Sequence, residues 1–272
     1  MLRLSHVSKT FNPGTVNAKQ ALTDLNLTVN NGDFITIIGA NGAGKSTLFN
    51  AIAGSFITDS GQITLDDTDI TLMPEHIRAH RIGRLFQDPM RGTAAGMTIE
   101  ENLTLAAGKG GWLSHIDRKQ REEFREILSR LDMGLEDRMK QPMGLLSGGQ
   151  RQAVTLLMAT INPPSVLLLD EHTAALDPAA ADKVLKITRE VVRQEHLTCL
   201  MITHNMESAL STGNRTLMMS DGNIVVDVSG EERDRLQVED LLNMFSEASG
   251  KKLDTDRILL KEGASCKLLS GS

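Results

Sequence analysis

Apolar positions in the first third of the chain follow the patterns of strands. Five short runs alternate apolar and polar residues or are continuously apolar, at 2–8, 21–29, 34–39, 61–70 and 81–87. The run at 34–39 is unbroken and rich in β-branched residues, which is typical of a buried parallel strand. Residues 61–70 predict a hairpin with an acidic pair in its turn. A helical pattern from Ser46 to about Gly54 separates these last two features.

The middle of the chain changes to helical periodicity, from about 98 to 160. Alternation then returns, with a strand, a helix, a strand, a hairpin and a helix expected at 166–170, 180–194, 198–204, 216–228 and from 238. Strands that alternate with helices indicate a mostly parallel sheet with helices on its faces. The sequence therefore predicts an α/β core that is interrupted by a helical insert.

Composition narrows the class of protein. The 272 residues are 40% hydrophobic and 24% charged, which is ordinary for a globular domain, and the net charge of −6 argues against a dedicated nucleic-acid binder. Two cysteines cannot form a disulfide scaffold, so a reduced cytosolic setting is expected. No apolar run reaches membrane-spanning length and no signal peptide is recognisable. If the chain works at a membrane, we expect another polypeptide to span it.

A glycine-rich segment supplies the first candidate chemistry. Residues 39–47, GANGAGKST, fit the pattern G-x-x-x-x-G-K-[ST] between the buried strand and the next helix. Gly42 and Gly44 let backbone N–H groups face phosphate oxygens, and the helix N-terminus adds positive potential. Lys45 can reach the β- and γ-phosphates, and the Ser46 hydroxyl can bind Mg²⁺. A turn that binds nothing is the alternative, but the strand and helix in the right order favour a phosphate loop.

Two acids follow the apolar strand that ends near residue 169. A carboxylate at the end of a buried strand is costly unless it meets a cation or hydrogen-bond donors. Asp170 is therefore predicted on the Mg²⁺ side, and Glu171 is the candidate that orients or deprotonates an attacking water. The alternative is a pair of acids that caps a helix. The nearby phosphate loop favours the catalytic interpretation.

LSGGQRQA at 146–153 places two glycines after a serine at the start of a helix, which makes a second anion-binding terminus. LSGGQ resembles the signature of the ATP-binding cassette (ABC) ATPases. The resemblance covers roughly residues 2–228, with the family's motifs in their usual order. It implies a P-loop NTPase (RecA-like) core with a mostly parallel sheet, an N-terminal antiparallel β subdomain and a helical insert.

Four further residues gain expected roles from this resemblance alone. Gln87 in RLFQDP resembles the glutamine that lies near Mg²⁺ and the attacking water, and His204 in MITHNM resembles the histidine that contacts the γ-phosphate. Asp177 in AALD resembles the acid at the seam of the family's dimer. Phe11 resembles the aromatic residue that stacks on adenine; the family usually has tyrosine there, and this chain has none.

The expected site is shared between two copies of the chain, with ATP between the phosphate loop of one and LSGGQ of the other. The expected catalytic residues are Glu171, His204, Gln87 and Lys45. The expected ATP-binding residues are Phe11, Gly39, Asn41, Gly42, Ala43, Gly44, Lys45, Ser46, Thr47, Ser147, Gly148, Gly149 and Gln150. The expected Mg²⁺ ligands are Ser46, Gln87 and Asp170.

The resemblance also implies a domain organisation. A single ATPase domain is expected over residues 1–245, followed by a C-terminal tail over 246–272. Within the domain, the core and β subdomain take about 1–88 and 160–228, and the helical subdomain takes about 89–159. The segment 88–111 suits the docking of a membrane subunit, and an ordinary loop is the alternative. His76 and His80 are expected on a solvated helix rather than at a metal site.

One departure from the family is visible. The family usually reads DEPT after the strand that carries the two acids, and this chain reads DEHT, with His172 in place of proline. DEHTAALDP resembles a subgroup of bacterial cassettes, some of which resemble components of aromatic amino-acid uptake systems.

The function implied by the resemblance is hydrolysis of ATP to ADP and phosphate to power a bacterial ABC transporter, with import of amino acids favoured. The implied partners are a second copy of the chain, membrane permease subunits and an extracellular or lipoprotein solute-binding protein, without nucleic acid. The implied location is the cytoplasmic face of the membrane. The alternatives are a cassette of a cell-division or signalling complex and a cassette of an exporter.

Overall fold

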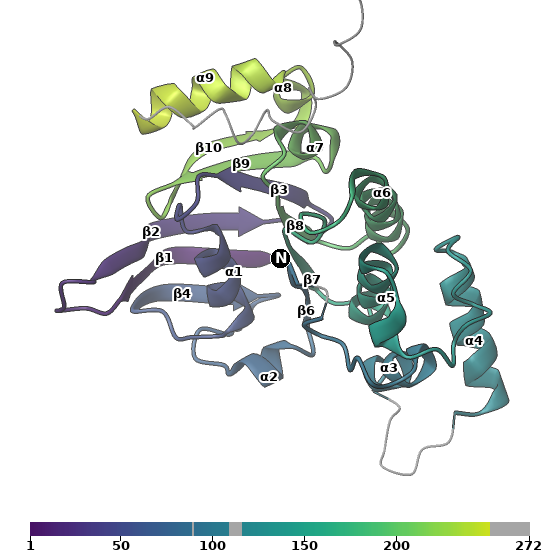
Figure 1. The fold of residues 1–272 in the computed structure, drawn as a ribbon. Coiled ribbons are helices and arrows are strands. Elements are labelled where there is room, and N and C mark those ends of the chain that lie inside the picture. Colours follow the sequence, from purple (N-terminus) through teal and green to yellow (C-terminus); the bar gives the residue numbers. More distant parts are fainter. Residues whose placement is uncertain (89, 109–115, 251–272) are drawn as a thin grey trace, which may run out of the picture.

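The computed structural model describes residues 1–88, 90–108 and 116–250 and places them in two sheets with surrounding helices (Figure 1). The smaller sheet is antiparallel, in the order β2-β1-β4-β5. Its strands are β1 (Leu2–Phe11), β2 (Lys19–Val29), β4 (Ser60–Leu65) and β5 (Thr68–Asp69). The turn between β4 and β5 holds Asp66 and Asp67, both with positive φ, which confirms the predicted hairpin and its acidic turn.

The larger sheet has the order β10-β9-β3-β8-β7-β6 and is parallel except for the pair β9 and β10. Its strands are β3 (Phe34–Gly39), β6 (Ile82–Leu85), β7 (Val166–Asp170), β8 (Cys199–Ile202), β9 (Arg215–Ser220) and β10 (Asn223–Ser229). Every residue of β3 is buried, as its continuous apolar run predicts. The predicted fold class, with a mostly parallel core sheet and an antiparallel N-terminal sheet, is confirmed.

Helices connect and cover these sheets. They are α1 (Lys45–Ala53), α2 (Glu75–Arg78), α3 (Ile99–Ala106), α4 (Arg118–Ser129), α5 (Gly148–Thr160), α6 (Pro178–Gln194), α7 (Met206–Ser211), α8 (Gly230–Asp234) and α9 (Val238–Ser249), with a 3₁₀ turn at Met143–Leu145. No helix in the described part of the chain is long and apolar enough to cross a membrane. The expected start of the tail, residue 246, falls inside α9, and residues 251–272 lie outside the described residues.

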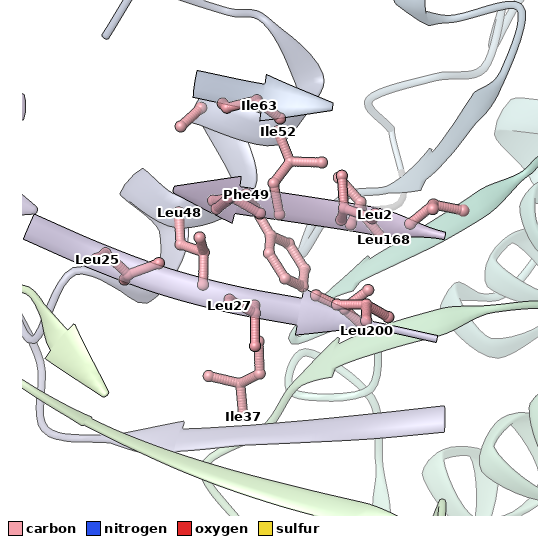
Figure 2. Close-up of a cluster of buried hydrophobic side chains, with 14 of the residues drawn as sticks. Leu2, Leu25, Leu27, Ile37, Leu48, Phe49, Ile52, Ile63, Leu168 and Leu200 are labelled. Carbon is pink, nitrogen blue, oxygen red and sulfur yellow. The ribbon is translucent and has the colours of Figure 1, made fainter. Parts of the chain in front are cut away.

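The main core lies around α1. Its side chains Phe49 and Ile52 are fully buried among strand residues of both sheets (Figure 2). Leu2 of β1 and Ile37 of β3 belong to the same cluster. Because burying one such side chain contributes about 1.5–3 kcal/mol, this contact fixes α1 firmly between the sheets. A second cluster joins α3, α4, α5 and α6 to the large sheet, and a third joins α7 and α9 to β9 and β10.

The side chain of Arg78 caps the C-terminal end of α1. Its side chain is only 3% exposed and donates hydrogen bonds to the carbonyl oxygens of Ala51, Ile52, Thr71 and Met73, at 2.8–2.9 Å. Helix ends leave carbonyl groups without partners, and here a guanidinium supplies the donors. Burial lowers the pKa of Arg78. His76 and His80 are exposed, as expected for a solvated segment, whereas the carbonyl partners of Arg78 hold its side chain in the interior.

We expect Arg78→Met to lower the free energy of unfolding by about 3 kcal/mol, because each of the four carbonyl groups loses its hydrogen bond to the guanidinium. Arg118→Met, which changes an exposed arginine on α4, is the matched control and should cost less than about 0.5 kcal/mol. Urea titrations followed by circular dichroism measure both values. Equal stability of the two variants would contradict the structural role of Arg78.

Candidate nucleotide site

The phosphate loop connects the end of β3 to the start of α1. Gly44 precedes the helix with φ of 105°, and a side-chain carbon added there would lie 2.5 Å from the Ala21 carbonyl oxygen. Only glycine fits both the backbone conformation and the close approach of β2. The N-terminus of α1 consequently has no side-chain cap, which leaves its first N–H groups available to a ligand. This geometry is suited to an anion.

Lys45 lies folded back over this loop. Its ammonium donates to the carbonyl oxygens of Gly39 at 2.7 Å and Ala40 at 3.1 Å, and the residue is 5% exposed. Burial lowers the pKa of Lys45, and the nearby carboxylates of Glu171 and Asp170 oppose that shift. The loop's own carbonyl groups thus hold the lysine where a phosphate group would meet it.

A cavity of about 260 Å³ opens over the loop. Its lining residues are Phe11, Lys19, Ala21, Asn41, Gly42, Gly44, Lys45, Ser46, Thr47 and Glu171. The cavity therefore brings together most of the expected phosphate-loop residues, the expected adenine-stacking residue and one of the two acids; Gly39 and Ala43 of the loop do not line it. The two sheets, α1 and the end of β7 all contribute to it.

Two neighbouring parallel strands place Glu171 beside His204. Asp170 at the end of β7 lies opposite Ile202 at the end of β8, so the residues that follow these strands meet at one edge of the sheet. The Nε2 atom of His204 lies 2.5 Å from Oε1 of Glu171. That hydrogen bond lowers the pKa of Glu171, against an opposing effect of burial. Glu171 is therefore held as a carboxylate, the form that can accept a proton.

Asp170 has a different environment. Burial raises the pKa of its carboxyl group, the charge of Arg84 opposes that shift, and the like charge of Glu171 adds to it. The Arg84 Nη2 atom lies 3.7 Å from Oδ2 of Asp170 and donates to Oδ1 of Asn50 at 2.7 Å. A buried carboxylate that is repelled by a neighbouring carboxylate gains from a nearby cation.

Phe11 lies at the end of β1, on the rim of the cavity, with 37% of its surface exposed. Its ring meets the edge of the Phe56 ring, with centroids 5.4 Å apart. The Lys9 ammonium lies 5.8 Å from the centre of the Phe11 ring and donates to Asp59 at 2.7 Å. Phe11 is thus supported by other side chains while its exposed surface stays free to meet a flat ligand such as a nucleobase.

The remaining expected residues lie away from the cavity lining. Ser147 caps α5, and its side chain and that of Gln150 accept hydrogen bonds from each other's backbone N–H groups, at 3.3 and 3.2 Å. Gly148 and Gly149 form the first residues of that helix. None of these four residues lines the 260 Å³ cavity, and neither does Gln87, which is exposed just after β6. Their roles toward a nucleotide stay predictions.

Lys19 lines the cavity although the sequence pattern gave no indication of it. Residues 11–19 are rich in turn formers, and a lone lysine there is typical of a solvated loop. In the structure Lys19 begins β2 and pairs in register with Phe11. A side-chain carbon added to Gly42 would lie 3.2 Å from the Lys19 Nζ atom, so this ammonium lies over the phosphate loop. Only the strand register reveals this second cation.

Comparison with known proteins identifies the family of the chain. A family model described as ABC transporter matches residues 22–174. A tyrosine transport ATP-binding protein of Clostridioides difficile is 41% identical over 250 residues, which cover 91% of this chain and all of that protein. A methionine import ATP-binding protein of Rhodococcus jostii is 34% identical over 83% of this chain, and the match spans 65% of that longer protein.

Solved structures agree with the sequence relatives. A dimeric ATP-binding cassette bound to ADP and Pi in a post-hydrolysis state has a TM-score of 0.72 to this chain at 27% identity. The match covers 84% of this chain and 98% of that one. A cassette in its ADP conformation has a TM-score of 0.73, also at 27% identity, and covers 90% of this chain. The phosphate loop, the paired acids and these matches show that the chain belongs to the ABC transporter family as an ATP-binding cassette with ATPase activity.

Proposed function

We propose that this chain is the ATP-hydrolysing subunit of a bacterial importer whose solute is an amino acid. The cavity over the phosphate loop carries the proposal, because it joins phosphate-binding groups to a carboxylate that can activate water. The relatives named for tyrosine transport and methionine import support the class of solute. The resemblance of DEHTAALDP to cassettes of aromatic amino-acid uptake systems agrees with the relative named for tyrosine transport.

The proposed reaction is attack of water on the γ-phosphorus of ATP. Glu171 orients and deprotonates the water, and His204, which contacts Glu171, is proposed to bind the γ-phosphate. Lys45 leaves its two carbonyl partners to bind the phosphates, and Phe11 stacks on adenine. The hydrolysed bond joins the β- and γ-phosphates, so ADP and phosphate are the products.

The oxygen donors of Ser46 in the loop and of Asp170 at the end of β7 fit Mg²⁺. Ser46, Asp170 and Gln87 would hold it, and it would offset the negative charge of the phosphates. One observation supports the fit. Burial and the charge of Glu171 disfavour the Asp170 carboxylate in the absence of a cation.

The second half of the nucleotide site is proposed to come from another copy of the chain. The N-terminus of α5 is suited to an anion, yet Ser147 and its neighbours do not line the chain's own cavity. A head-to-tail dimer about a two-fold axis would bring this terminus to the partner's phosphate loop. The dimeric relative with bound ADP and Pi supports that arrangement.

A groove of about 650 Å³ beside β6, α3 and α5 is the proposed docking place for the membrane permease. Apolar side chains of Ile82, Phe86, Leu105 and Met158 line it, and Leu105 is 52% exposed. Part of the segment 88–111 contributes to this lining, as its proposed docking role requires. The permease would hold the cassette at the cytoplasmic face of the membrane, and a solute-binding protein outside the cell would deliver the amino acid.

We expect Glu171→Gln to bind ATP with an affinity close to that of the wild type and to lose at least about 100-fold in turnover, because an amide cannot accept the proton. With hydrolysis blocked, the ATP-bound dimer should accumulate. Phosphate release and light scattering coupled to gel filtration measure the two effects. Near-normal turnover in this variant would remove Glu171 from the proposed role.

We expect Lys19→Met to weaken ATP and ADP binding about fivefold, because the chain loses a cation over the phosphate loop. The difference should shrink at high salt, since an exposed charge is screened. Isothermal titration calorimetry at two salt concentrations measures the affinities. Lys119→Met, on the exposed face of α4, is the matched control; an equal effect of both changes would refute a local role for Lys19.

We expect Leu105→Glu to prevent assembly with the permease while ATP affinity of the chain alone stays within about twofold, because a charge among the apolar side chains of the groove opposes docking. Leu72→Glu, at a residue that is 75% exposed and outside the groove, is the control. Co-purification with the permease and uptake of labelled tyrosine into proteoliposomes measure the outcome. Normal assembly of the groove variant would place the interface elsewhere.

A further inference from the structure

His172 directly follows Glu171 and is buried, with 2% of its surface exposed. Its Nε2 atom lies 3.1 Å from the Thr188 Oγ1 atom, and Thr188 is a fully buried residue of α6. None of the reactions proposed above uses this pair. It nevertheless links the residue next to the proposed water-activating group to the interior of a long helix.

The direction of this hydrogen bond follows from the number of available protons. The Thr188 hydroxyl donates its single proton to the Val184 carbonyl oxygen, at 2.9 Å. The hydroxyl oxygen must then accept from His172, so the imidazole carries its proton on Nε2. Proline or another residue without a donor at position 172 could not form this bond, and proline would also restrict the backbone of Glu171.

Glu171 has a backbone conformation that needs support. Its φ is 48°, in the left-handed region that residues other than glycine rarely adopt. Its N–H donates to the Ile202 carbonyl oxygen at 3.1 Å, and its own carbonyl accepts from Ala174 at 2.9 Å. The hydrogen bond of the next residue, His172, to Thr188 links this segment to α6. Such conformations persist where the surrounding structure holds them in place.

The N-terminus of α6 is fixed as well. Asp177 caps α6 by accepting from the Ala180 N–H at 3.0 Å, so the segment between β7 and α6 is held at both ends. A side-chain carbon added to Gly149 of α5 would lie 3.0 Å from the Ala180 Cβ atom. The helix that anchors His172 therefore packs against the helix that begins with the signature residues.

We propose that the hydrogen bond from His172 to Thr188 positions Glu171. It anchors the segment that follows β7 to α6 and so keeps the Glu171 carboxylate aimed at the attacking water. His172 and Thr188 are positioning residues, since neither lines the nucleotide cavity. The inference rests on the proposed role of Glu171 in hydrolysis.

The test compares Thr188→Val with Thr188→Ser. Valine keeps the branched shape and removes the acceptor, whereas serine keeps the hydroxyl. We expect valine to lower kcat about tenfold with the KM for ATP within about twofold of wild type, because a small displacement of a reacting group is costly while binding is not affected. Serine should keep kcat within about twofold. Steady-state phosphate release by the purified full chain gives both constants, and circular dichroism at the assay temperature confirms folding.

A second pair of variants covers the case in which valine disrupts folding. His172→Gln keeps an amide N–H that can donate to Thr188, and His172→Leu removes it. We expect the glutamine variant to retain more than half of the wild-type kcat and the leucine variant to lose about tenfold. Nitrogen-15 spectra of histidine-labelled protein should show the His172 proton on Nε2, with a shifted resonance in Thr188→Val.

Specific results would overturn the proposal. Equal kcat values for valine and serine at position 188, or a His172 proton on Nδ1, would each refute it. A loss that appears only as weaker ATP binding would do so as well. Failure of the proposed function is separate, because it would appear as full turnover in Glu171→Gln, whatever the residues at 172 and 188.

Discussion

The packing of α1 between the two sheets is the constraint on which the nucleotide site depends. Phe49 and Ile52 lie in one buried cluster with residues of both sheets and leave the helix little freedom to shift (Figure 2). The N-terminus of α1, with its unpaired N–H groups, is therefore held at a fixed distance from the end of β7. A phosphate loop on a poorly packed helix could not keep its lysine and the two acids in one place.

Charge at the site is balanced among groups that would each be unfavourable alone. Lys45 is buried, Asp170 is disfavoured as a carboxylate by burial, and Glu171 is stabilised as one by His204. Arg84 compensates part of the negative charge of Asp170. The arrangement keeps acids with different pKa shifts next to each other, which allows one to remain a proton acceptor while the other favours a cation.

Much of this organisation could be predicted from the sequence, because it depends on local pattern. The run 34–39, the glycine loop and the acids after 169 each carry their information within ten residues. Lys19 and Arg78 could not be predicted in the same way. The importance of Lys19 arises from strand register, and that of Arg78 arises from the carbonyl groups of Ala51 and Ile52, 27 and 26 residues earlier in the chain. The position of His172 was visible as a departure from the family, but its partner Thr188 became apparent only through the packing of α6.

The strand order of the large sheet has a consequence for the newly made chain. β3 carries the phosphate loop and is synthesised early, yet both of its neighbours in the sheet, β8 and β9, come from the last third of the sequence. Phe34 pairs with Cys199 and Ile35 pairs with Arg215, and both partners are synthesised much later. While the ribosome is still translating, the glycine segment has no completed sheet beneath it. The sheet that supports the glycine segment is therefore complete only once synthesis has passed β9.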